Sequence, residues 1–220
     1  MSDHLNAENV ARTARRLAAE GMLIGTAGNV SVRDDDHVFV TATGVTLADC
    51  SADDIVKVTL DGEIRSGRMV PTSELSLHLG VYARVHDVRA VVHTHAPFAT
   101  ALACVAGLDT LPVLHYQQLS LGGEVRVAPF APFGSPQLAE FVDVALADRR
   151  AALMANHGSV TVGTDLEDAF DKAVLLEWLA GLYLHARSVG PVRPLTPQQQ
   201  QDTIIQAINL QYGQTRENHS

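Results

Sequence analysis

The chain has 220 residues, which is long enough for one domain with a sizeable core of its own. Asp and Glu outnumber Lys and Arg by 25 to 16, so the formal net charge is −9 with histidine neutral, which argues against a nucleic-acid partner. Hydrophobic residues make up 46% of the chain and charged residues 19%, a balance that excludes the intrinsically disordered class.

The sequence also predicts a cytoplasmic protein that has no membrane partner. Its most apolar stretch, 173–184, is only 12 residues long and contains Glu177, whereas a membrane span needs roughly 18 or more apolar residues. The N-terminus carries early acidic residues and no apolar signal segment. The two cysteines, Cys50 and Cys104, form no C-x-x-C pair, which indicates a reducing compartment.

The first part of the chain predicts one helix, two hairpins and a second helix. Asp3 can cap the first helix and Gly21 can end it. The acidic turn 34–36 and the Asp61-Gly62 pair each separate two short alternating segments, a pattern typical of hairpins. The expected elements are a helix over 3–20, strands over 29–33, 37–41, 56–60 and 63–65, and a helix that opens at 71–74 and ends near 87.

The second part of the chain mixes short strands with helices. Its longest expected helix is apolar nearly all round in the middle, which implies burial against the sheet or against a partner subunit. Gly190, Pro191 and Pro194 end that helix, and a polar helix follows. The expected elements are strands over 88–95, 111–116, 124–129, 151–155 and 160–162, and helices over 97–103, 136–148, 165–188 and 196–210.

Hairpins, rather than regular βαβ units, connect many of these elements. We therefore expect an α/β fold, with a single domain over 1–210 whose central, largely antiparallel sheet is flanked by helices. Residues 211–220 follow as a tail whose composition gives no reason for order by itself.

Three histidines in strand-like or strand-end positions are candidates for a metal site. His93 and His95 are two residues apart on an apolar run, so their side chains leave the same face of a strand. Such a pair alone is weak evidence, because alternating histidines also occur on surfaces and in hydrogen-bonded cores. His157 strengthens it, because it directly follows another apolar strand. Three imidazole ligands leave an open coordination position, as in catalytic zinc sites.

Glu74 is the fourth candidate for this chemistry. It lies in the first turn of an expected helix, where a carboxylate can simply complement the helix dipole. Beside a metal, however, the same carboxylate could take and return a proton. Three short segments, 25–29, 43–44 and 72–73, could offer backbone N–H groups and hydroxyls to a phosphate, although each is also typical of an ordinary turn.

Five blocks of residues, in this order over nearly the whole chain, resemble the class II aldolase and adducin head family. The blocks are Gly25-Thr26-Ala27-Gly28-Asn29-Val30-Ser31, Thr43-Gly44, Thr72-Ser73-Glu74, His93-Thr94-His95 and Asn156-His157-Gly158. A second set resembles the branch of aldolases that act on L-fuculose 1-phosphate or a related ketose phosphate. These are His115-Tyr116, Gly122-Gly123, Ala128-Pro129, Phe133-Gly134 and Tyr212-Gly213.

The resemblance implies a metal-dependent aldehyde-lyase with one zinc ion per subunit. His93, His95, His157 and Glu74 would hold the zinc, and Glu74 would also shuttle a proton during turnover. The reaction would split a ketose 1-phosphate reversibly into dihydroxyacetone phosphate and a short aldehyde such as lactaldehyde.

The resemblance also assigns the rest of the site and the assembly. Tyr116 from a neighbouring subunit would donate a proton to the aldehyde oxygen, Tyr212 on the tail would help to close the site, and Phe133 would form an apolar wall facing the aldehyde. The family implies a homotetramer with active sites between subunits. Residue 72 is often Ser in the family, and Thr72 keeps the hydroxyl. The phosphate would be held by Thr26, Asn29, Thr43, Gly44, Thr72 and Ser73.

Several relatives within the same family remain alternatives. A pentulose-5-phosphate 4-epimerase would use the same zinc chemistry but usually carries Asp at the position of Glu74, so this residue favours the aldolase. A dehydratase acting on methylthioribulose 1-phosphate and a decarboxylase of a phosphorylated sugar acid are further alternatives. A non-catalytic, adducin-like module would be expected to have lost the metal ligands, whereas all three histidines and Glu74 are present here.

Overall fold

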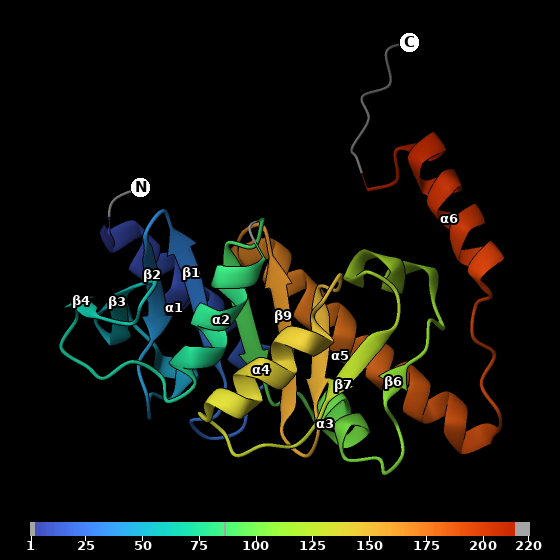
Figure 1. The fold of residues 1–220 in the computed structure, drawn as a ribbon, viewed down its shortest axis with the longest axis horizontal. Coiled ribbons are helices and arrows are strands. Elements are labelled where there is room, and N and C mark those ends of the chain that lie inside the picture. The colour runs from blue at the N-terminus through green and yellow to red at the C-terminus, as the bar shows by residue number, and fades with distance from the viewer. Residues whose placement is uncertain (1–2, 86, 214–220) are drawn as a thin grey trace.

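The strands of the protein form one mixed sheet (Figure 1). The structure is a computed structural model that describes residues 3–85 and 87–213. In chain order the strands are β1 (Asn29–Asp34), β2 (His37–Thr41), β3 (Ile55–Thr59), β4 (Ile64–Ser66), β5 (Ala90–Thr94), β6 (Thr110–Leu111), β7 (Val125–Ala128), β8 (Ala151–Met154) and β9 (Gly158–Gly163). Within the described ranges the sheet has nine strands in the order β4-β3-β2-β1-β5-β9-β8-β7-β6.

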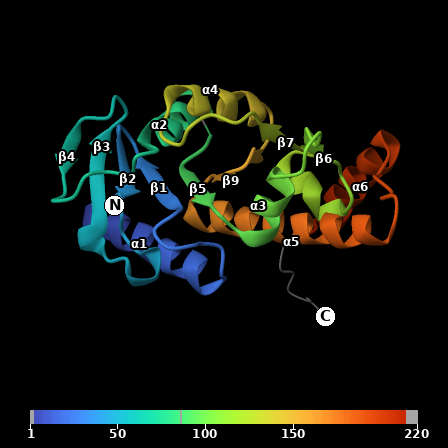
Figure 2. The same cartoon turned by 90° about the horizontal axis from the view of Figure 1, so that it is seen from below.

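Helices cover both faces of this sheet (Figure 2). They are α1 (Asp3–Ala19), α2 (Leu75–Arg84), α3 (Pro97–Ala103), α4 (Pro136–Ala145), α5 (Leu166–Val189) and α6 (Pro197–Leu210), with 3-10 segments η1 (Leu47–Asp49), η2 (Ala52–Asp54) and η3 (Tyr116–Leu121). Helices α1, α3 and α5 lie on one face, and α2 and α4 lie on the other. Over the part of the chain that the structure describes, no helix is long and apolar enough to cross a membrane.

The strand pairing confirms the prediction of a single domain with a largely antiparallel sheet. Among the described residues, each pair of neighbouring strands is antiparallel except β7 and β8, which run parallel. The two predicted hairpins are present as β1–β2 and β3–β4. In the centre of the sheet, β1 and β9 pair with the two edges of β5.

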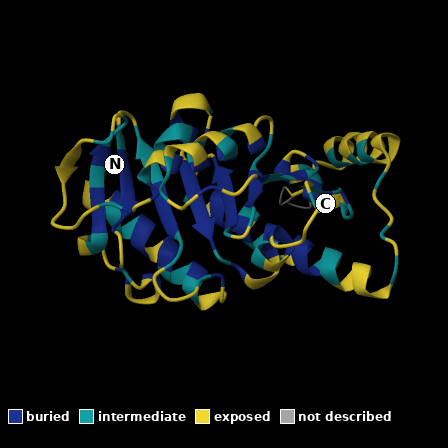
Figure 3. Ribbon diagram, turned by 60° about the horizontal axis from the view of Figure 1, so that its bottom comes forward, coloured by how far each residue is buried: buried dark blue, intermediate teal, exposed yellow. Residues whose placement is uncertain are grey.

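Two apolar cores result from the period-two alternation of the central strands. On β5, Ala90 and Val92 pack with α1, α3 and α5, whereas Val91 packs with α2 and α4. Figure 3 shows the central strands as almost continuously buried, while α6 is largely exposed. The alternation also fixes where the next residue of β5 points, because His93 lies on the same face as Val91.

The structure corrects the prediction of a strand over 111–116. Strand β6 ends at Leu111 because Pro112 has no N–H to donate to a ladder, and Tyr116 instead begins the 3-10 segment η3. Glu74 is the N-cap residue of α2, which ends at Arg84 rather than near residue 87.

The C-terminal helices agree with their predicted positions. Helix α5 buries one side, from Ala169 to Gly181, and leaves Trp178 about half exposed. The last helix, α6, has no buried residue among those described. Its apolar side chains Ile204, Ile205 and Ile208 are therefore exposed. Of the predicted tail, residues 211–213 form a turn, and 214–220 lie outside the described residues.

Candidate active site

The three candidate histidines converge at one end of the central strands. His93 is on β5, His95 follows the end of that strand, and His157 lies in the tight turn between β8 and β9. One ring nitrogen from each residue lies within 4.8 Å of the others. The Nε2 atoms of His93 and His95 are 3.1 Å apart. Strand pairing therefore turns two sequence-distant motifs into one cluster of imidazoles.

Backbone groups orient His93 within this cluster. Its Nδ1 lies 2.9 Å from the carbonyl oxygen of Ser159 on β9, and a carbonyl oxygen can only accept, so Nδ1 carries the proton. When the ring is neutral, the other ring nitrogen, Nε2, carries the lone pair and faces the cluster. Gly158 makes this close approach possible, because a Cβ there would lie 2.3 Å from the carbonyl oxygen of Thr94.

Glu74 supplies the carboxylate of the cluster. Among the described residues its side chain makes no hydrogen bond that caps its own helix, so the helix-dipole interpretation does not account for it. Instead Oε2 lies 3.1 Å from His93 Nε2, and Oε1 lies 3.5 Å from His157 Nε2. The side-chain amide of Asn29 also donates to Oε2, at 3.0 Å.

Electrostatic effects favour an ionised Glu74 and neutral imidazoles at His95 and His157, the forms that bind a metal. Burial alone would raise the pKa of Glu74, but the charge and hydrogen bond of His93, together with Asn29 and His157, outweigh it and hold the pKa well below its usual range. Burial, followed by the charges of His93 and His157, lowers the pKa of His95 to about 4. Burial and His93 also lower the pKa of His157.

These four side chains fit a divalent metal ion. The oxygen Oε1 of Glu74 is buried and has no hydrogen-bond partner anywhere in residues 3–85 and 87–213. A tetrahedral zinc ion with bonds of about 2.0–2.1 Å would separate its ligand atoms by about 3.3 Å, close to the 3.1 and 3.5 Å spacings to Glu74. A cation bound by these nitrogens and this oxygen would also remove the cost of leaving Oε1 unpaired.

A cavity of about 620 Å³ opens beside the cluster. It is lined by the predicted phosphate-binding segments, by three of the four metal candidates, and by the loop that follows β7. The predicted residues in its lining are Thr26, Asn29, Thr43, Gly44, Thr72, Ser73, Glu74, His95, His157 and Phe133. The loop comes close to Ser73 only because residue 134 is glycine, where a Cβ would lie 2.6 Å from the Ser73 carbonyl oxygen.

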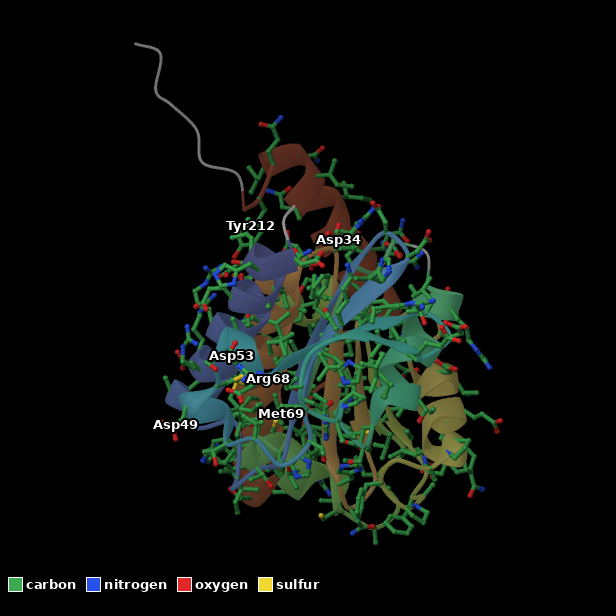
Figure 4. The ribbon with its side chains drawn as sticks, turned by 90° about the vertical axis from the view of Figure 1, so that its left-hand side faces the viewer. Asp34, Asp49, Asp53, Arg68, Met69 and Tyr212 are labelled. Atoms are coloured by element: carbon green, nitrogen blue, oxygen red, sulfur yellow. The ribbon has the colours of Figure 1, made fainter. Side chains whose placement is uncertain are left out.

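Tyr116 and Tyr212 lie elsewhere in this chain. Their hydroxyl groups are 3.1 Å apart, and both line a second, apolar cavity of about 590 Å³ between η3, α5 and α6. Figure 4 shows Tyr212 just beyond the end of α6. Among the residues that the structure describes, neither tyrosine lines the cavity beside the histidines.

Two further groups of residues were not identified from the sequence. Phe130 and Asn156 also line the cavity beside the histidines, and Phe130, like Phe133, is largely exposed. Ser31, His78 and Tyr82 form a buried polar row behind Glu74. The spacing of Glu74, His78 and Tyr82, each four residues apart, places all three on one helix face and could have indicated this row.

The chain is similar to known proteins over most of its length. A model of the class II aldolase and adducin N-terminal domain matches residues 8–184. Over 201 residues the chain is 37% identical to a 5-methylthioribulose-1-phosphate/5-deoxyribulose-1-phosphate aldolase of Rhodospirillum rubrum, with 91% of this chain and 89% of that protein covered. Over 188 residues it is 35% identical to a 3-oxo-tetronate 4-phosphate decarboxylase of Haemophilus influenzae, with 83% and 89% covered.

The fold agrees with these sequence matches. A solved structure of an L-fuculose 1-phosphate aldolase superimposes with a TM-score of 0.87 at 30% identity, and the match covers 94% of this chain and 96% of that one. The family and the fold class predicted from the sequence motifs are therefore confirmed, as is the prediction of an enzyme. The chain belongs to the class II aldolase and adducin family and is an enzyme of that family.

Proposed function

We propose that the protein is a zinc-dependent aldolase that cleaves a ketose 1-phosphate reversibly to dihydroxyacetone phosphate and a short aldehyde. The observation that carries this proposal is the buried Oε1 of Glu74, which has no hydrogen-bond partner among the described residues and faces His157 beside a cavity large enough for a sugar phosphate. L-Fuculose 1-phosphate or a related deoxyketose phosphate is the proposed substrate, because relatives named for such aldolases match nearly the whole chain.

Glu74 performs the proton transfer in this proposal. A zinc ion held by His93, His95, His157 and Glu74 would supply Lewis-acid stabilisation of the negative charge that develops when the carbon–carbon bond breaks. Asn29 occupies Oε2 of Glu74, so Oε1, which would be a metal ligand only in the resting site, is the atom that would hold the moving proton during turnover. In the condensation direction Oε1 takes a proton from the carbon of dihydroxyacetone phosphate that forms the new bond, and in cleavage it returns that proton.

The remaining cavity residues bind and orient the substrate. The phosphate is held at the segments that meet in the cavity lining, where glycine turns and hydroxyl groups lie close together. The exposed ring of Phe133, with Phe130 beside it in the lining, forms an apolar wall against which the aldehyde end packs. The phosphate-binding residues in this proposal are Thr26, Asn29, Thr43, Gly44, Thr72 and Ser73.

The proton for the aldehyde oxygen comes from a neighbouring subunit. In its own chain Tyr116 does not line the cavity beside the histidines, as far as the described residues go. It is about half exposed, so it is available to another copy. We therefore propose a homotetramer with active sites between subunits, in which Tyr212 on the tail helps to close each site. The free thiols of Cys50 and Cys104 agree with a role in the reducing cytoplasm.

A direct assay separates this function from its relatives. Purified protein of measured zinc content is incubated with L-fuculose 1-phosphate and, separately, with 5-deoxyribulose 1-phosphate, and released dihydroxyacetone phosphate is followed through coupled oxidation of NADH. Release that a chelator abolishes and added zinc restores supports the aldolase. Zinc-loaded protein that releases none from either substrate contradicts it. Interconversion of pentulose 5-phosphates would instead identify an epimerase, and loss of carbon dioxide from a phosphorylated sugar acid a decarboxylase.

A further inference from the structure

Five polar side chains form a continuous buried row between β1 and α2. Asn29 and Ser31 are two residues apart on β1 and share the face that α2 covers. Glu74, His78 and Tyr82 are four residues apart and share one face of α2. All five are at most 5% exposed, so each polar atom in the row depends on a protein partner rather than on bulk water.

Each neighbouring pair in the row lies at hydrogen-bonding distance. Tyr82 Oη is 2.7 Å from Ser31 Oγ, and Ser31 Oγ is 2.7 Å from His78 Nδ1. His78 Nε2 is 2.5 Å from Asn29 Oδ1, and Asn29 Nδ2 is 3.0 Å from Glu74 Oε2. The row therefore connects the interior of the protein to the carboxylate of the active site.

The charge on Glu74 fixes the direction of every hydrogen bond in this row. An ionised carboxylate can only accept, so Asn29 must turn its NH₂ group to Glu74 and its carbonyl oxygen to His78. The imidazole of His78 must then carry its proton on Nε2 and accept at Nδ1 from the hydroxyl of Ser31. Ser31 in turn accepts from Tyr82. The donors all point toward the active site.

We propose that His78 is a positioning residue for the reaction, because it holds the Asn29 amide in the one orientation that serves both Glu74 and the substrate phosphate. An NH₂ group has two hydrogens, of which one goes to Glu74 Oε2. The second remains for an anion in the cavity, which Asn29 lines. This inference rests on the proposed function for its catalytic consequence.

An apolar residue at position 78 would not hold the amide in this way. Oδ1 of Asn29 would lose its donor, and the amide could rotate so that Oδ1 faced the Glu74 carboxylate. Two acceptors would then oppose each other, and Glu74 would lose the hydrogen bond that assigns Oε2 and leaves Oε1 for the proton. The substrate phosphate would lose the donor from Asn29 at the same time.

Two substitutions of similar polarity separate the contact with Asn29 from the contact with Ser31. In His78→Gln the side-chain nitrogen reaches the position of the imidazole Nε2 and can still donate to Asn29 Oδ1. In His78→Asn the shorter amide reaches the position of Nδ1 and leaves Oδ1 without its donor. Tyr82→Phe is the structural control, because it breaks the same buried row at its far end and keeps the contact between His78 and Asn29.

Steady-state kinetics of zinc-loaded variants, normalised to bound zinc, test the proposal. We expect His78→Asn to lower kcat/KM by about 10–100-fold, with a lower kcat and a higher KM, as is typical for residues that orient a metal-site group. His78→Gln and Tyr82→Phe should stay close to the parent protein. The double variant, with both Asn29→Ala and His78→Asn, should be little less active than the single variant Asn29→Ala. Equal losses in His78→Asn and Tyr82→Phe, or additive losses in the double variant, would overturn the proposal.

Histidine side-chain NMR of the full zinc-loaded chain tests the arrangement independently of activity. The signals of His78, assigned by comparison with His78→Gln, should show a neutral ring with its proton on Nε2. A proton on Nδ1 would overturn the inference whatever the kinetics. If the parent protein turned over no ketose 1-phosphate but showed the Nε2 proton, the proposed function would be wrong while the arrangement of Asn29 would stand.

Discussion

The buried imidazole of His78 predicts a specific loss of stability in acid. Burial, together with the charge of His93, lowers the pKa of His78 to about 3 in the folded protein, compared with the usual 6.5. Below pH 6.5 the unfolded chain therefore binds a proton that the folded chain does not bind. The contribution of His78 to stability is complete above pH 6.5 and is lost progressively as the pH falls from 6.5 toward 3.

The size of this effect follows from the linkage between protonation and folding. The free energy of unfolding should fall by about 1.4 kcal/mol per pH unit in this range from His78 alone, or by about 2 kcal/mol between pH 7 and pH 5. In His78→Gln this contribution is absent, because an amide does not titrate. The three histidines of the cluster are present in both proteins, so the difference between the two pH profiles reports on His78 and its coupling to His93.

Urea unfolding of both proteins without metal, followed by circular dichroism at pH 7, 6 and 5, measures that difference. Removing the metal prevents its release in acid from contributing to the result. We expect the parent protein to lose about 2 kcal/mol more than His78→Gln over this interval. Parallel profiles would show that folding does not lower the pKa of His78. Its ring would then be protonated in the folded protein below pH 6.5, which would refute the direction of hydrogen bonds assigned to the buried row.

Three further changes test the role of Glu74, the packing at Gly134 and the role of the tail. Glu74→Gln should keep the fold and stoichiometric zinc, because three imidazoles remain. It should lower turnover by about 10²–10⁴-fold in the dihydroxyacetone phosphate assay, and full activity would refute the role of Glu74 in proton transfer. Gly134→Ala should raise KM for the sugar phosphate, since its Cβ would lie 2.6 Å from the Ser73 carbonyl oxygen at a φ of +71°. Gly190→Ala is the matched control, because a Cβ there would have nothing within 4 Å, and equal KM values in the two variants would contradict this packing. Removing the tail from Gln211 onward should reduce activity more than the unfolding temperature, because residues 211–213 are exposed; a large drop in that temperature would show that the tail supports the fold.

The local patterns of the sequence predict the elements of this fold well. Alternation and turn residues identify the hairpins, and the i, i+2 spacing places His93 and His95 together. The strand predicted at 111–116 was wrong because the apolar alternation suggested a ladder that Pro112 cannot join. The missing N–H of Pro112 ends the ladder at Leu111, whatever the apolar alternation around it.

The contacts that assemble the site were harder to predict. The sequence spacing left Glu74 equally compatible with a helix-dipole role and a metal role, since only the packing of α2 on the sheet brings it to His93. The same packing brings His78 to Asn29, residues separated by 49 positions. Strand spacing and the family resemblance predicted the histidine group, whereas the buried row emerged only from the folded contacts.

Proton exchange in dihydroxyacetone phosphate alone tests the central claim without any assumption about the aldehyde. Zinc-loaded protein is incubated with this compound in D₂O, and its carbon-bound hydrogens are followed by NMR in parallel with Glu74→Gln and with chelator-treated protein. We predict that the parent protein exchanges one hydrogen on the hydroxymethyl carbon, and that both controls exchange far more slowly. Absence of exchange in zinc-loaded parent protein, or exchange that persists in Glu74→Gln, would contradict the assignment of Glu74 as the group that takes and returns the proton.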